Sequence, residues 1–148
     1  TQKDLQDVLE ERTSLEELAV SLACERIQPQ QIGQLEEALK NFEEALAGTD
    51  VTAIARADVD FHDVIFSSTG NARLVQILNN LREQMYRYRL EYLKDFSSHS
   101  RLLQEHKELL RAICAHDKET ASKIIRTHIY NQEISVIRHI RQNQDGKE

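Results

Sequence analysis

The chain has 148 residues, with four glycines, one proline and a formal net charge of −6. It is long enough for one domain with a sizeable core, and its many helix-forming residues with so few turn residues are typical of helices joined by short loops. The acidic balance, without a basic patch, argues against a nucleic-acid interface in this chain. No run of about 18 apolar residues exists, which excludes a membrane-spanning helix.

Apolar residues recur at helical spacing and predict three helices in the first half of the chain. The first covers about residues 2–26, and the second begins near Pro29, which suits the first turn of a helix. Gly48 ends the second helix, and the third covers about residues 50–68. Gly70 is placed to end the third helix in a left-handed conformation.

The second half continues the same pattern. One helix starts near Asn71 and runs to a serine-rich break at 96–100, which separates it from a fifth helix. Asp117 is the expected cap of a sixth helix, and the tail at 142–148 is expected to fray. No stretch alternates as a strand would, so the sequence predicts a single all-α domain over residues 1–148, an antiparallel bundle of six to seven helices.

The two cysteines indicate the compartment in which the protein resides. Cys24 and Cys114 are isolated thiols in a chain that does not need disulfides for stability, which is typical of reduced cysteines in a cytosolic protein. We therefore predict a cytoplasmic location. The chain begins with Thr1 and shows no signal peptide, which fits a fragment or a processed chain.

The stretch DVDFHDVIF, residues 58–66, places ionisable groups on the apolar face of the third predicted helix. Residues four apart share a helical face, so Asp58 and His62 lie together inside the apolar stripe. Asp60 and Asp63 turn away and are expected to be solvated. An aspartate in a core is costly unless it is paired or coordinated.

Two further histidines occupy apolar stripes, namely His106 on the fifth predicted helix and His128 on the sixth. Three helices thus direct nitrogen or oxygen donors inward, and imidazole and carboxylate suit Zn²⁺, Ni²⁺, Fe²⁺ or Mn²⁺. The pattern predicts a metal site formed by Asp58, His62, His106 and His128. The alternatives are a buried Asp58–His62 salt bridge and ordinary hydrogen-bonded core histidines.

Arginines on apolar faces provide a second signal. Arg12 lies at the centre of the first helix's stripe, and Glu16 shares its face one turn later. This spacing fits either an intrahelical pair that reaches the surface or a bidentate clamp for a carboxylate ligand. Arg82 and Arg89, seven residues apart, are candidates to line the same cavity. The basic and aromatic segment 85–92, MYRYRLEY, is more typical of an amphipathic core helix than of a nucleic-acid surface.

Five short pieces spread over nearly the whole chain match one known family in its own order. They are ERTSLEELAVSLA (11–23), DVDFH (58–62), STGNARL (68–74), EHKELLRAICAHD (105–117) and THIYNQ (127–132). Together they resemble the C-terminal ligand-binding domain of the FadR subfamily of GntR bacterial transcription regulators. The most specific part is His106, directly after a glutamate, followed 22 residues later by His128.

This resemblance implies an antiparallel helical bundle that binds a small effector and a divalent metal, often zinc or nickel. The ligands it implies are Asp58, His62, His106 and His128, the same residues that the helical faces select. Family effectors are commonly small organic acids whose carboxylates approach the metal and nearby arginines. Arg12 occupies the family's arginine position on the first helix. The fatty-acyl-CoA-responsive branch lacks the metal ligands, so the chain resembles the other branch.

The family's N-terminal winged helix-turn-helix is absent from this chain. A complete member would bind operator DNA as a homodimer, so we expect this chain to keep effector sensing and dimerisation only. We predict a non-enzymatic regulatory domain in which Arg12, Arg82 and Arg89 bind a small organic acid. The alternatives are a mononuclear metalloenzyme and a metal-free interaction bundle, although the motifs of di-iron bundles, HExxH proteases, phosphate loops and nucleophile elbows are all missing.

Overall fold

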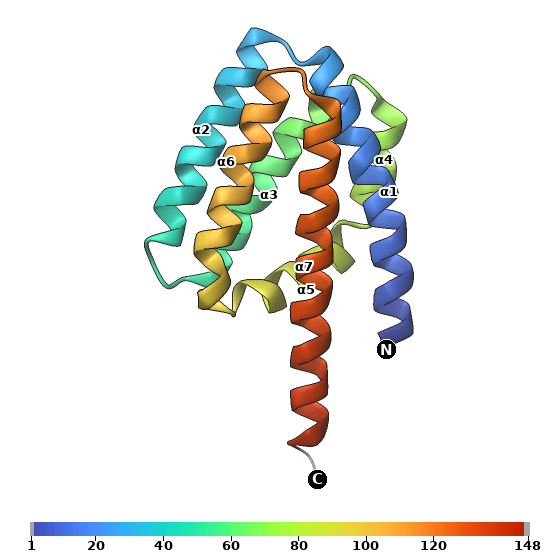
Figure 1. Ribbon diagram of the computed structural model, residues 1–148, viewed down its shortest axis with the longest axis vertical. Coiled ribbons are helices and arrows are strands. Elements are labelled where there is room, and N and C mark those ends of the chain that lie inside the picture. Colours follow the sequence, from blue (N-terminus) through green and yellow to red (C-terminus); the bar gives the residue numbers. More distant parts are fainter. Residues whose placement is uncertain (1, 147–148) are drawn as a thin grey trace.

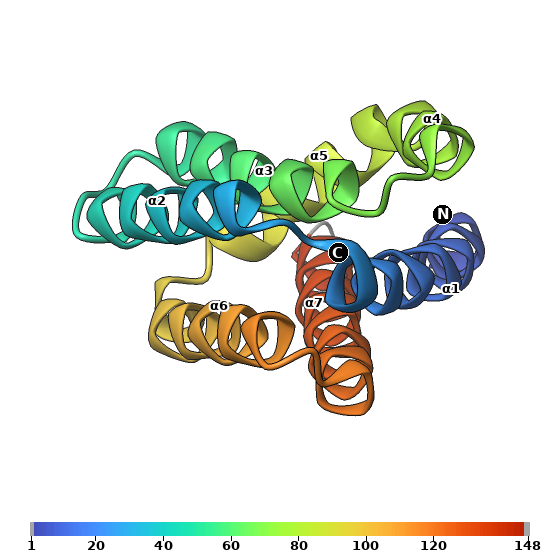
Figure 2. The same ribbon diagram turned by 90° about the horizontal axis from the view of Figure 1, so that it is seen from above.

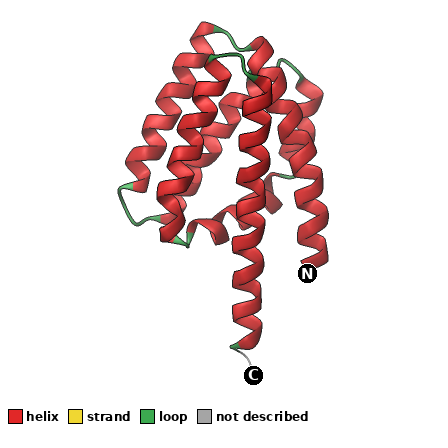
Figure 3. Cartoon of the chain, viewed as in Figure 1, coloured by secondary structure: helices red, strands yellow, loops and turns green. Residues whose placement is uncertain are grey.

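The structure, a computed structural model, describes residues 2–146, and these form helices and no strand. In chain order the elements are α1 (Gln2–Arg26), α2 (Pro29–Leu46), α3 (Val51–Ser67), α4 (Ala72–Asn80), α5 (Arg82–Leu93), the short 3-10 helix η1 (Phe96–Ser98), α6 (His99–Cys114) and α7 (Lys118–Asp145). Short loops join them (Figure 3). The predicted all-α bundle is therefore confirmed. None of these helices combines the length and apolarity needed to cross a bilayer.

The helices enclose a single core. α1 packs along α7, α2 packs along α3, and α6 contacts both α7 and α2. α5 crosses the end of this arrangement and contacts α3 and α7, while α4 lies against α1 and α3 (Figures 1 and 2). The C-terminal part of α7 projects beyond the other helices. This arrangement points one face of α1, α3, α5, α6 and α7 toward a common centre.

The predicted helix starts are confirmed by their capping contacts. Pro29 is the first residue of α2. Asn71 accepts a hydrogen bond from the backbone N–H of Leu74 at 3.1 Å, and Asp117 accepts one from the backbone N–H of Thr120 at 3.1 Å. Each side chain replaces a helical partner that the first turn lacks.

Two boundaries differ from the prediction. The helix expected from Asn71 to the serine-rich break is wrong, because the chain breaks at Leu81 into α4 and α5. There the backbone N–H of Leu81 bonds to the carbonyl of Leu78 at 3.1 Å, closing α4 with a tight final turn. Neither Gly nor Pro marks this break. The expected fraying of the tail is also wrong as far as the structure describes it, because α7 continues to Asp145; residues 147–148 lie outside the described residues.

Replacing Gly70 or Gly33 with alanine should change the unfolding free energy in opposite directions. Gly70 has φ +62°, a left-handed conformation that L-residues avoid, so Gly70→Ala should cost about 1–2 kcal/mol of unfolding free energy. Gly33 lies within α2, exposed, with no atom within 4 Å of an added Cβ. Gly33→Ala should therefore stabilise the domain by roughly 0.5–1 kcal/mol. Urea denaturation of both variants measures the difference, and equal shifts would contradict it.

Both cysteines are free thiols, as the prediction of reduced cysteines requires. Cys24 is fully buried, and burial raises its pKa to about 11, so the thiol stays protonated at neutral pH. Cys114 is only partly buried at the end of α6.

Candidate metal and effector site

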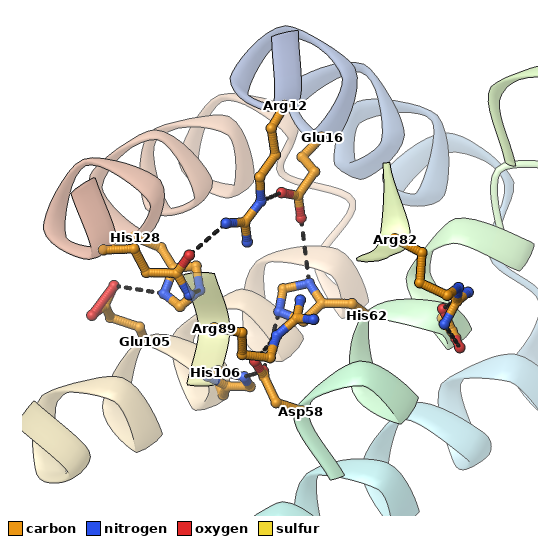
Figure 4. Close-up of polar contacts among 11 residues, drawn as sticks. Arg12, Glu16, Asp58, His62, Arg82, Arg89, Glu105, His106 and His128 are labelled. Carbon is orange, nitrogen blue, oxygen red and sulfur yellow. Dashed lines mark hydrogen bonds and ion pairs between the residues drawn. The ribbon is translucent and has the colours of Figure 1, made fainter. Parts of the chain in front are cut away.

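Three of the packed helices bring the predicted metal ligands to the centre of the bundle. α3 contributes Asp58 and His62, α6 contributes His106 and α7 contributes His128 (Figure 4). All four residues are buried, with exposed fractions of 1–3%. Each helix directs its apolar stripe inward, so the ionisable residues within those stripes are carried into the core.

Asp58, His62 and His106 converge closely. Each offers one ligand atom, and these three atoms lie within 4.8 Å of one another. The Oδ1 atom of Asp58 is 2.6 Å from Nε2 of His106 and 3.2 Å from Nε2 of His62. His128 lies beside this group without belonging to it, its ring centroid 5.9 Å from that of His62 and 5.7 Å from that of His106.

The contacts of His106 place both of its ring nitrogens close to oxygen atoms. Its Nδ1 atom is 2.8 Å from the carbonyl oxygen of Leu102, which only accepts hydrogen bonds, so Nδ1 carries a proton. In neutral imidazole Nε2 then presents a lone pair, yet this atom is 2.6 Å from a carboxylate oxygen. Two lone pairs repel at that distance, so the arrangement fits a shared cation, either a proton or a metal ion.

The second oxygen of Asp58 pairs with Arg89, which reaches in from α5. Nε of Arg89 donates to Oδ2 of Asp58 at 2.6 Å, and Arg89 is 3% exposed. Burial alone would raise the pKa of Asp58, but Arg89, His62 and His106 hold it well below 3.8. The carboxylate is therefore ionised. Arg89, predicted to bind effector, is engaged by this aspartate.

The predicted intrahelical pair of Arg12 and Glu16 is present, but it is buried and does not reach the surface. Arg12 and Glu16 are both fully buried, and Nε of Arg12 donates to Oε2 of Glu16. Nη1 of Arg12 donates to Oε1 of Gln132 on α7 at 2.5 Å, while Nη2 has no hydrogen-bond partner. Burial would raise the pKa of Glu16, but Arg12 and His62 hold it below 4.5. Arg12 thus forms a buried ion pair with Glu16 and keeps one donor without a partner, close to the ligand cluster (Figure 4).

Two members of the site were missed by the sequence analysis. Gln132 follows His128 by one helical turn, and its Nε2 atom is 3.5 Å from Nε2 of His128. Glu105 precedes His106, and its Oε2 atom is 3.4 Å from Nδ1 of His128. Both residues lie within the quoted pieces 105–117 and 127–132. The only signal for them in the sequence was their position next to predicted ligands: Gln132 lies four residues after His128, and Glu105 lies directly before His106.

The other candidate residues lie away from the centre. Arg82 forms a two-pronged ion pair with Asp63 at the surface, with 2.9 Å between its Nη2 atom and Oδ1. Its side chain is 45% exposed. His99 is buried and bonds through Nε2 to the carbonyl of Leu93 at 2.8 Å. His139 is half-buried and pairs with Glu91.

Two small pockets border the cluster. One, of about 20 Å³, is lined by His62, Arg82 and Arg89 among others. The second, of about 10 Å³, lies between α6 and α7 and is lined by His62, Glu105, His106 and His128 with apolar neighbours. Spaces of this size hold roughly one water molecule or one ion. An organic acid would need side chains to move.

The donor set fits a divalent metal ion. Three imidazoles and one carboxylate match the ligand preferences of zinc and nickel. Both ring nitrogens of His62 and Nδ1 of His128 are buried without a hydrogen-bond partner. Burial lowers the pKa of His128, which keeps its ring neutral and able to coordinate.

The bundle and its buried polar centre define a helical ligand-binding domain. Comparison with known families makes this specific, because the FCD domain matches residues 7–131. The chain therefore belongs to the FCD domain family, the effector-binding domains of transcription regulators. The predicted resemblance to the FadR C-terminal domain is confirmed at this level, and the family is regulatory rather than enzymatic.

Relatives agree with this assignment. The HTH-type transcriptional regulator YdhC of Bacillus subtilis (strain 168) is 27% identical over 150 residues, which cover the whole chain but only 65% of YdhC. Among solved structures, McbR/YncC of E. coli has a TM-score of 0.82 at 22% identity, over 94% of this chain and 70% of that one. The metal-free FCD domain of TM0439 has a TM-score of 0.79 at 19% identity, over 96% and 97% of the two chains. A GntR family member from Pseudomonas syringae pv. tomato str. DC3000 has a TM-score of 0.79 at 20% identity, over 100% of this chain and 61% of that one. These structures support the fold.

Proposed function

We propose that this domain binds one divalent metal ion, zinc or nickel, through Asp58, His62, His106 and His128. A small organic acid would bind across the ion and the free donor of Arg12. The observation that supports this most strongly is the convergence of buried donors from α3 and α6 to within 4.8 Å, with Asp58 and His106 in a contact that a shared metal ion would satisfy. The ion would supply a Lewis-acidic partner for a carboxylate.

The buried charges favour the same ligand class. Asp58 pairs with Arg89, and Glu16 pairs with Arg12, so these four groups balance. A divalent ion would add two positive charges to this balanced set. A carboxylate ligand would offset part of that charge, and a buried site tolerates charges best when they are matched.

Effector binding in this site would change the packing of the bundle. The pockets beside the cluster hold about 10 and 20 Å³, too little for an organic acid. The ligand would contact the free Nη2 atom of Arg12, next to the Nη1 contact with Gln132 that joins α1 to α7, so that space for it would have to open between these two helices. An effector that binds the rearranged state more tightly would shift the equilibrium toward it. The shift cannot exceed the difference between the effector's affinities for the two states.

In the intact regulator we propose that this shift alters the binding of operator DNA. DNA contact would be made by an N-terminal winged helix-turn-helix outside this chain, which spans 65% of the length of YdhC. We also propose that the regulator is a cytoplasmic homodimer. Arg89 would then serve mainly to hold Asp58, and Arg82 would assist the ligand only if its surface pair with Asp63 opened.

Isothermal titration calorimetry of the chelator-treated domain with Zn²⁺ and Ni²⁺ tests metal binding. We expect one ion per chain for the wild type and at least a hundredfold weaker binding for His106→Ala, because one of the four proposed ligand atoms is lost. His139→Ala, at a half-buried histidine of α7 that pairs with Glu91 away from the cluster, is the matched control and should bind as the wild type does. Equal affinity of His106→Ala and wild type would refute the site.

A second titration with lactate, citrate and sugar acids tests the effector. The expected result is binding to the metal-loaded domain that weakens in the metal-free domain. Turnover of such an acid by the loaded protein would instead support a mononuclear enzyme. A domain that purifies without metal and gains no thermal stability from Zn²⁺ or Ni²⁺ would support the metal-free interaction bundle.

A further inference from the structure

The contacts of Arg12 determine how the amide of Gln132 is oriented. A guanidinium has only donors, so the atom of Gln132 that lies 2.5 Å from Nη1 of Arg12 is the amide oxygen. The amide nitrogen therefore faces α7's own histidine, His128, with 3.5 Å between the two Nε2 atoms. This removes the usual ambiguity of an amide flip.

The same reasoning assigns the proton on His128. An amide nitrogen only donates, so Nε2 of His128 is the unprotonated nitrogen, and the proton of the neutral ring sits on Nδ1. The nearest acceptor to Nδ1 is Oε2 of Glu105, at 3.4 Å. Nε2 thereby keeps a lone pair, which faces the amide of Gln132, and the ring centroid of His128 lies 5.9 Å from that of His62 and 5.7 Å from that of His106.

Glu105 itself needs such a partner. Both of its carboxylate oxygens are buried without a hydrogen bond, although its side chain is 12% exposed overall. The nearest cation is Arg101, whose Nε is 3.7 Å from Oε1 and whose side chain is 55% exposed. A buried carboxylate that lacks hydrogen bonds is costly, so its retention beside an imidazole calls for an explanation.

We propose that Glu105 is the positioning residue of the metal site: it accepts the Nδ1 proton of His128, fixes the ring's tautomer and so presents Nε2 as the fourth ligand atom. This inference rests on the proposed metal site. A carboxylate behind a ligand histidine also makes the imidazole a better donor, and losing such a partner typically weakens metal affinity 10–100-fold. Glu105 thus explains how His128, which stands outside the close trio, joins it.

The tautomer can be measured without metal, by the ¹⁵N chemical shifts of His128 in the labelled, chelator-treated domain. We expect the Nδ1–H form in the wild type and in Glu105→Gln, whose amide oxygen still accepts the proton. Glu105→Ala should shift the ring toward a mixture of tautomers. An Nε2–H ring in the wild type, or an unchanged tautomer in Glu105→Ala, would overturn the assignment whether or not the domain binds metal.

Metal affinity, measured by competition with a chromophoric chelator, supplies the second readout. Zn²⁺ should bind 10–100-fold more weakly to Glu105→Ala than to the wild type. Glu105→Gln should also bind Zn²⁺ more weakly than the wild type, but by a smaller factor, because its amide oxygen still accepts the proton. Glu108→Gln, at an exposed glutamate of the same helix, is the control and should match the wild type. Unchanged affinity in both Glu105 variants would refute the positioning role, whereas a wild type that binds no Zn²⁺ would refute the proposed metal site itself.

Discussion

Asp58→Ala should lower the unfolding free energy of the chelator-treated domain by about 3–5 kcal/mol, because removing one partner of a buried ion pair leaves the other charge uncompensated. The charge left behind is Arg89, which is 3% exposed and donates to Asp58 at 2.6 Å. His106 loses its contact with the carboxylate in the same step. Urea denaturation with chelator present measures the loss.

Two comparisons separate this effect from a general intolerance of α3 to substitution. Asp60→Ala, at an exposed aspartate of the same helix, should change stability by less than about 0.5 kcal/mol. The double variant Asp58→Leu with Arg89→Met should recover most of the loss, since apolar residues of similar volume often replace a buried pair without cost. An Asp58→Ala domain as stable as the wild type would show that Arg89 is neutralised by another group.

Arg12→Ala should cause a loss of similar size, about 3–5 kcal/mol at neutral pH. Glu16 would remain fully buried without its cation, and Oε1 of Gln132 would lose its donor. The variant should also lose binding of organic acids while keeping Zn²⁺ binding, because Arg12 is not a metal ligand. Denaturation curves and calorimetry test the two parts of this prediction separately.

The Arg12 prediction has a definite pH dependence. In the wild type the pKa of Glu16 lies below 4.5, so its ionised form contributes stability above that value, which is lost as pH falls through the folded pKa. Without Arg12, burial raises the pKa of Glu16 instead, and protonation relieves the buried charge. The stability difference between variant and wild type should therefore shrink from pH 7 toward pH 4. Glu16→Gln in the Arg12→Ala background should remove most of this dependence, and a difference that is constant with pH would contradict the assignment.

Helical periodicity was enough to predict most of the fold and the centre of the site. Asp58 and His62 lie four residues apart on an apolar stripe, and in a closed bundle any ionisable group on such a stripe is carried into the core. The same argument placed His106, His128 and Arg12. The caps at Asn71 and Asp117 were readable because a local side chain satisfies a local N–H, as the structure shows.

Contacts between helices could not be predicted in the same way. Arg82 and Arg89 share a face of α5, but α3 meets them with Asp63 at the surface and Asp58 in the core. An arginine is free to bind a ligand only if the neighbouring helix does not present an acid to it. The spacing of residues along one helix carries no information on which residues the neighbouring helix presents.

The break at Leu81 and the roles of two polar residues have the same cause. No Gly or Pro signals the break, because tertiary packing overrides a continuous helical pattern there. Gln132 and Glu105 gain their roles only from the side chains of Arg12 and His128 on other helices.

The most direct test of the whole account is a crystal structure of the Zn²⁺-soaked domain, with anomalous diffraction recorded at the zinc edge. We predict a single strong anomalous peak at the centre of the bundle, within coordinating distance of Asp58, His62, His106 and His128. No peak at saturating Zn²⁺, or a peak only at surface groups such as His139 and Glu91, would contradict it.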